Sequence, residues 1–166
     1  MTIATPNGST GTVPALLLGA ICPKYRQLLK ERHDSAKSGS GCTVAIPEAN
    51  EMAVRLFCHI VMTLSVDCFP EPRMTAEMLD VLVLAKRMGS NIVVNHILSL
   101  VPSKLSADTV GMVMRTAQVV GIRALYTECF KYVQHHWEQC KEREDIPGHI
   151  RSVLRLGPSY KLLWMT

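Results

Sequence analysis

The sequence has no uninterrupted apolar run close to the roughly 20 residues that a helix needs to cross a bilayer, which argues against a membrane span. It also has no CxxC pair among its six cysteines, which stand at positions 22, 42, 58, 68, 129 and 140. Four of these cysteines lie within or beside apolar segments, so we expect reduced, buried side chains and no disulfide framework. This pattern predicts a protein of the cytoplasm, the nucleus or both.

The sequence also lacks a common metal-binding pattern. The nearest approach is the set Cys129, His135, His136 and Cys140, in which Cys129 and His136 would share a helix face and Cys140 would follow His136 by one turn. The spacing matches no usual zinc pattern, and ordinary amphipathic packing explains the stretch. We therefore predict no metal site.

Catalytic motifs are missing as well. The sequence contains no GxSxG elbow, no phosphate loop ending in Gly-Lys-Ser/Thr, no HExxH helix and no dinucleotide fingerprint. Cys58 and His59 are adjacent, so on a helix they point to different faces, which does not suit a nucleophile and its base. We predict a protein that is not an enzyme and uses no cofactor.

An N-terminal targeting segment would need features that are absent. Residues 13–21 are apolar, but the polar lead before them has no Lys or Arg, and no small-x-small cleavage site follows. A buried first helix is the preferred interpretation, and a secretion signal is the alternative.

What the sequence does contain is the composition of a globular protein, with 48% hydrophobic and 19% charged residues. Its 166 residues fit one domain, or one domain with a few extra helices. The net charge is +4, but the basic residues are scattered, and from residue 141 to 145 they alternate with acids. This favours a solvated surface over a nucleic-acid groove, so we expect neither nucleic acid nor a membrane as a partner.

The first half of the chain predicts short elements and one long helix. Residues 1–12 are rich in Gly, Ser, Thr, Pro and Asn, and we predict a flexible tail there. Two short helices are expected over 13–21 and 23–30, and a strand over 43–46. Apolar residues then recur at every helical turn over 52–64, which predicts a long helix with Asn50 as its N-terminal cap.

The second half repeats itself at a spacing of about 32 residues. A helix opened by Thr75 and ended at Gly89 precedes a second helix, and a helix opened by Ser106 and ended at Gly121 precedes another. Glycine supplies the left-handed residue that ends many helices, so each unit is predicted to be a helix, a Gly turn and a helix.

The order of these elements resembles a BTB/POZ domain that continues into a BACK-type helical region. The likeness covers roughly residues 13–156 and rests on these segments: 15–25, in which Cys22-Pro23-Lys24-Tyr25 stands where the family has a Ser-Pro-aromatic turn, 43–47, 53–64, 78–88, 92–100 and 106–136. The hairpin that opens the family's domain is not evident before Val13, so we expect the first strands to be missing.

The resemblance implies a mainly α (α+β) fold, with a BTB/POZ-like helical cluster and a minimal β-sheet followed by BACK-like helix pairs. The expected division is a flexible tail over 1–12, a partial BTB/POZ-like domain over 13–103 and the start of a BACK-like region over 104–166. It also implies a protein-protein interaction module, namely a homodimeric adaptor that links a client protein to a cullin-based ubiquitin ligase.

The resemblance further implies a dimer interface in the first helices. We expect it to include Leu16, Leu17, Leu18 and Tyr25, although the same side chains would also serve to fill the core.

A cullin-facing surface is implied on the third helix and at the start of the next one. Its expected residues are Arg55, His59 and Thr75, and the alternative is that Arg55 and His59 are solvated without a partner.

The 32-residue repeat leaves open a helical-repeat (solenoid) scaffold without a ubiquitin-ligase role. The strand over 43–46 separates the two interpretations, because a solenoid of helix pairs has no use for a paired strand.

Overall fold

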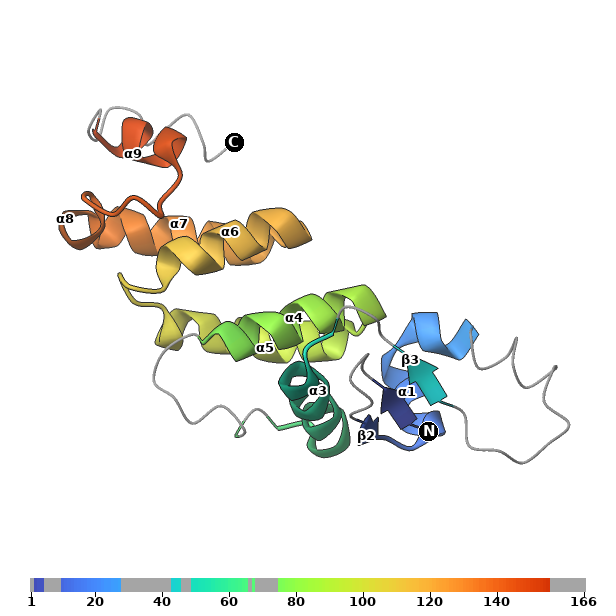
Figure 1. Ribbon diagram of the computed structural model, residues 1–166. Helices are drawn as coiled ribbons and strands as arrows, with labels where there is room; N and C mark the ends of the chain where they lie inside the picture. The colour runs from blue at the N-terminus through green and yellow to red at the C-terminus, as the bar shows by residue number, and fades with distance from the viewer. Residues whose placement is uncertain are drawn as a thin grey trace, which may run out of the picture. The chain divides into compact units, whose positions relative to one another are not determined.

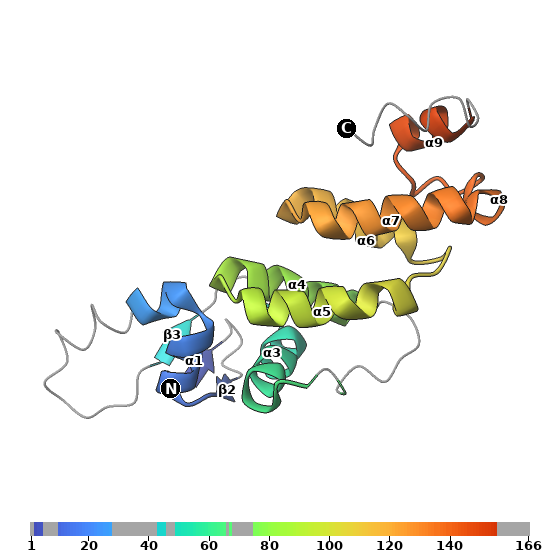
Figure 2. The ribbon, with the colours of Figure 1, turned by 180° about the vertical axis from the view of Figure 1, so that it is seen from behind.

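The computed structural model describes residues 2–4, 10–27, 43–45, 49–65, 67 and 75–155. This part of the chain is mainly helical, which confirms the predicted fold class, and a small sheet lies near the N-terminus (Figures 1 and 2). It divides into two compact units, unit 1 up to Leu100 and unit 2 from Val101. None of the described helices is long and apolar enough to span a bilayer.

The sheet of unit 1 has three short strands in the order β2-β1-β3. The central strand β1 (Thr2–Ala4) pairs antiparallel with β2 (Thr10–Thr12) and parallel with β3 (Thr43–Ala45). Ile3, in the middle of β1, lies opposite Gly11 and Val44 and is fully buried.

The sheet corrects two sequence predictions. The flexible tail over residues 1–12 and the absence of opening strands are both wrong at β1 and β2, which are paired strands. Threonine and isoleucine are β-branched and favour extended backbone, and the polar composition around them conceals this. The predicted strand over 43–46 is confirmed for Thr43–Ala45, while Ile46 lies outside the described residues. Its pairing with β1 contradicts an all-helical solenoid.

Between β2 and β3 the chain forms α1 (Ala15–Ile21), and residues 23–27 are helical again. The helix predicted over 13–21 therefore begins two residues late, because Pro14 occupies its N-cap position. Of the helix predicted over 23–30, residues 28–30 lie outside the described part.

Helix α3 (Glu51–Thr63) begins where the sequence predicts. The Asn50 side chain accepts a hydrogen bond from the backbone N–H of Met52 at 2.9 Å, which confirms the cap. The helix packs against α4 (Ala76–Met88), β2 and α1. Its buried face consists of Ala53, Val54, Phe57, Cys58, Ile60 and Val61.

The two predicted Gly turns are confirmed. Gly89 separates α4 from α5 (Asn91–Lys104), and Gly121 separates α6 (Val110–Val120) from α7 (Arg123–His135). Both glycines have a φ of 71°, which side chains disfavour. In each turn the next residue closes the helix end, since Ser90 N–H donates to the Ala85 carbonyl and Ile122 N–H to the Ala117 carbonyl, both at 2.9 Å.

Unit 2 continues with α8 (Trp137–Cys140) and α9 (Gly148–Arg155) after the packed pair α6 and α7. One prediction fails here, because Ser106 does not open a helix and α6 begins only at Val110. Residues 107–109 form a turn instead, in which the Ser106 carbonyl accepts from the N–H groups of Thr109 and Val110 at 3.1 and 3.0 Å.

Candidate functional site

Helix α1 separates its leucines between the core and the surface. Leu16 is 90% exposed, whereas Leu18 is fully buried and Tyr25 is 2% exposed. Leu17 is intermediate. Of the four residues expected in a dimer interface, Leu18 and Tyr25 therefore fill the core of unit 1, and Leu16 is the one that the structure leaves on the surface.

The solvent side of α3 carries a second surface, which we call the α3 face and define as Met52, Arg55, His59 and Met62. The four positions are three or four residues apart, so they share one side of the helix over about 15 Å. Met52 is 49% and Met62 is 56% exposed, and both Arg55 and His59 are exposed. Two flexible apolar side chains thus flank two polar ones.

The α3 face has one ion pair within the described residues. Arg55 Nη2 lies 2.6 Å from Glu51 Oε1, and the two side chains are 62% and 39% exposed. An exposed pair of this kind contributes no more than about 1 kcal/mol, so a partner carboxylate can compete for Arg55 at little cost.

Thr75, the third residue expected on a cullin-facing surface, lies at the start of α4, where the sequence predicts it. Its hydroxyl oxygen accepts a hydrogen bond from the Met78 N–H at 3.3 Å and caps the helix. The starts of α3 and α4 are joined by a hydrogen bond of 3.1 Å from Asn50 Nδ2 to Asp80 Oδ2. Thr75 therefore has a structural role, and Arg55 and His59 are the expected residues that the structure brings together.

Sequence reasoning missed the two methionines of this face. The apolar periodicity over 52–64 predicts that Met52 belongs to the buried side of the long helix, and it does not mark Met62 as a surface residue. The buried residues of α3 occupy the opposite side. A strict comparison of helical positions would have found both methionines, because each falls on the same side as His59 and away from Phe57.

The described cysteines are buried, and their thiols are expected to be unreactive. Burial raises the pKa of Cys22 and of Cys58 to about 11, and that of Cys129 to about 12. These thiols stay protonated near neutral pH and are weak nucleophiles.

In the described part of the chain, no three His, Cys, Asp or Glu side chains gather where they could hold a metal ion. The four Cys and His residues that come nearest to a metal-binding pattern in the sequence do not share one environment. Cys129 and Cys140 are buried, whereas His135 and His136 are exposed.

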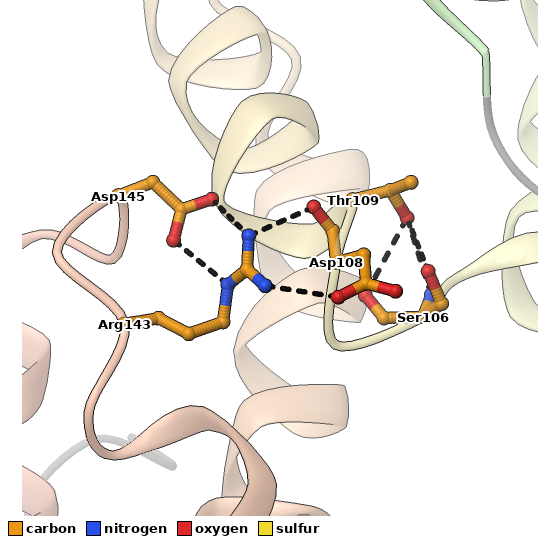
Figure 3. Close-up of polar contacts among 5 residues, drawn as sticks. All are labelled: Ser106, Asp108, Thr109, Arg143 and Asp145. Carbon is orange, nitrogen blue, oxygen red and sulfur yellow. Dashed lines mark hydrogen bonds and ion pairs between the residues drawn. The ribbon is translucent and has the colours of Figure 1, made fainter.

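In unit 2, Arg143 joins two loops (Figure 3). Its Nε and Nη2 donate to the Asp145 carboxylate at 3.0 and 3.1 Å, while Nη1 and Nη2 reach Asp108 Oδ1 and the Asp108 carbonyl, both at 3.0 Å. The hydrogen bonds to Asp145 raise the pKa of Arg143 above its ordinary value. The charged run from residue 141 to 145 lies at the surface, as the sequence predicts, and Arg143 in addition clamps two loops together.

In comparisons with known proteins, no protein-family model and no curated protein matches the chain.

Proposed function

We propose that the protein is a BTB/POZ-type interaction module, followed by BACK-like helix pairs, that acts by binding and not by catalysis. In this proposal the chain forms a homodimer and links a client protein to a cullin-based ubiquitin ligase, in the cytoplasm, the nucleus or both. The order of elements supports it, with an antiparallel strand pair, then α1, then β3 parallel to β1, then α3 and the helix pairs. Because one fold can host many functions, surface residues have to carry the proposal.

The observation that carries self-association is the 90% exposure of Leu16. Burying a leucine side chain fully stabilises an assembly by roughly 1.5–3 kcal/mol. A two-fold interface uses the same patch on both copies, so the Leu16 side chains of both copies would be buried in it. Leu18 and Ile21 are already buried on the same short helix, so α1 is held in place and presents Leu16 on a rigid support.

Exchange between copies tests this interface. An untagged copy of the full chain is expected to co-purify with a tagged copy, and Leu16→Asp in both copies is expected to abolish the exchange because it places a charge in the apolar contact. Val119→Asp is the matched control, since Val119 is 88% exposed on α6. Undiminished exchange by the Leu16→Asp copies would contradict self-association through α1.

The α3 face supports a partner role because it combines exposed apolar side chains with Arg55 and His59. Immobilised full chain is expected to retain a purified cullin N-terminal domain at micromolar concentration. Met62→Asp is expected to weaken that binding about ten-fold or more, as interface hot spots do. Thr127→Asp, at an exposed position of α7, is the control. Absence of retention by the native chain would contradict the cullin role.

A helical-repeat scaffold is the second candidate, and the repeated Gly turns favour it. The bonds that close α4 and α6 have the same pattern, at Ala85 and Ser90 in the first turn and at Ala117 and Ile122 in the second. Because β3 pairs with β1, this candidate applies only to the helix pairs after residue 75. A native chain that binds no cullin domain and does not self-associate would favour the scaffold.

A further inference from the structure

The described methionines differ widely in exposure, and Met88 is buried while Met112 is intermediate. Met52 and Met62 are 49% and 56% exposed and lie on the same side of α3, whereas Met78 and Met114 are fully buried. The thioethers of the first pair are open to small reagents in the folded chain. Those of the second pair become accessible only after local unfolding.

The buried thiols leave these thioethers as the reactive sulfur groups of unit 1 within its described part. Cys22 and Cys58 are buried, with pKa values raised to about 11, so they are protonated and shielded near neutral pH. Oxidation of cysteine by a peroxide needs the thiolate, but oxidation of a thioether needs no deprotonation. Exposure alone therefore makes Met52 and Met62 the side chains in the described part of unit 1 that a peroxide is expected to oxidise first.

We propose that Met52 and Met62 are a peroxide-modification site and that their oxidation weakens partner docking on the α3 face, the second part resting on the proposed function. In each reaction one peroxide oxygen is transferred to the methionine sulfur, so that an S–O bond forms and the O–O bond breaks. The sulfur is oxidised by two electrons to the sulfoxide, and the peroxide is reduced to water or an alcohol. The product side chain is polar and chiral where an apolar contact was available.

The consequence is local because neither side chain belongs to the core. The buried face of α3 is made by other residues, among them Phe57, Ile60 and Val61. The oxidised chain therefore keeps its fold and changes the character of one surface. Met52 precedes Arg55 by three residues and Met62 follows His59 by three, so each sulfoxide lies beside a polar residue of the face.

The first experiment needs no partner. The full native chain is treated with hydrogen peroxide, and site-resolved oxidation is followed by peptide mass spectrometry under native conditions. Met52 and Met62 are expected to oxidise more than about ten-fold faster than Met78 and Met114, because the buried pair must wait for opening. Oxidation should also shorten retention on a hydrophobic-interaction column. Similar rates at all four sites, or unchanged retention, would overturn the inference.

The second experiment measures docking of a purified cullin N-terminal domain before and after peroxide treatment. The double variant Met52→Leu and Met62→Leu is the control, because leucine keeps a similar volume without an oxidisable sulfur. Peroxide should lower retention by the native chain and leave that of the variant unchanged. Equal losses, or no loss, would overturn the regulatory part. If neither untreated chain binds the domain, the proposed cullin role fails, and the rates and the column retention still decide the modification site.

Discussion

Gly111 illustrates how closely a single position in unit 2 is constrained. It lies near the start of α6, and a Cβ built on it would collide with the Asp145 carboxylate and stand 2.9 Å from the Asp145 carbonyl carbon. Asp145 holds Arg143 through two hydrogen bonds, and Arg143 in turn holds Asp108. A shift of Asp145 would therefore loosen the clamp that joins the two loops.

Gly111→Ala is accordingly expected to destabilise the chain by about 1–3 kcal/mol, the usual cost of crowding a well-packed site. Urea unfolding followed by circular dichroism measures the change. Gly148→Ala is the control, since no heavy atom lies within 4 Å of a Cβ built there, and it should change stability by no more than about 0.5 kcal/mol. Native stability of the Gly111→Ala variant would refute the close contact with Asp145.

The buried thiol of Cys129 makes stability depend on pH in the alkaline range. Burial raises its pKa from an ordinary value of 9.0 to about 12, so the folded chain keeps this proton at a higher pH than the unfolded chain does. Its contribution to stability is complete below pH 9 and is lost as the pH rises towards 12.

The free energy of unfolding is therefore expected to fall above pH 9, with a slope from this group of at most about 1.4 kcal/mol per pH unit. Urea titrations at several pH values measure the slope in the native chain and in Cys129→Ala. The variant should show a shallower fall. The same slope in both proteins would argue that Cys129 is not buried as described.

Among the elements, helices and their ends were predictable because their signals are local. Asn50 caps α3 through a hydrogen bond two residues away, and Gly89 and Gly121 end helices through their own backbone conformation. Strands β1 and β2 were not predicted, because each has only three residues. Their formation also depends on pairing with other segments, and Thr2, for example, pairs with the distant Thr43. Three residues of alternating pattern are too few to indicate a strand.

The candidate surfaces were only partly predictable, because burial within a short helix depends on what packs beside it. The sequence places three leucines in a row on α1, and only the structure separates exposed Leu16 from buried Leu18. The contact between Arg143 and Asp108 could not be predicted from the sequence, because 35 residues separate the two and no local pattern links them. Arg55 and His59 were expected from the resemblance, and helical spacing explains why they lie on one side of α3.

The strand β1 offers a direct test of the corrected N-terminal region. Ile3 is fully buried between Gly11 and Val44, so Ile3→Ala is expected to destabilise the chain by about 2–5 kcal/mol. Thermal unfolding followed by circular dichroism measures the loss. Val119→Ala truncates an exposed apolar residue and should have little effect. A flexible tail over residues 1–12 would instead make both substitutions equally harmless.

For the whole molecule, both candidate surfaces belong to unit 1, on α1 and on α3, whereas unit 2 is stabilised by its helix pair and by the Arg143 clamp. The proposed self-association and the proposed partner docking therefore both belong to the sheet-containing unit.

Sedimentation equilibrium of the native chain over a range of micromolar concentrations measures self-association of the protein without any tag or partner. The apparent mass is expected to rise reversibly from the chain mass of 18.4 kDa to twice that value, and Leu16→Asp is expected to remain at the single-chain mass. Val119→Asp should behave like the native chain. A native mass of 18.4 kDa at every concentration would contradict a self-associating module.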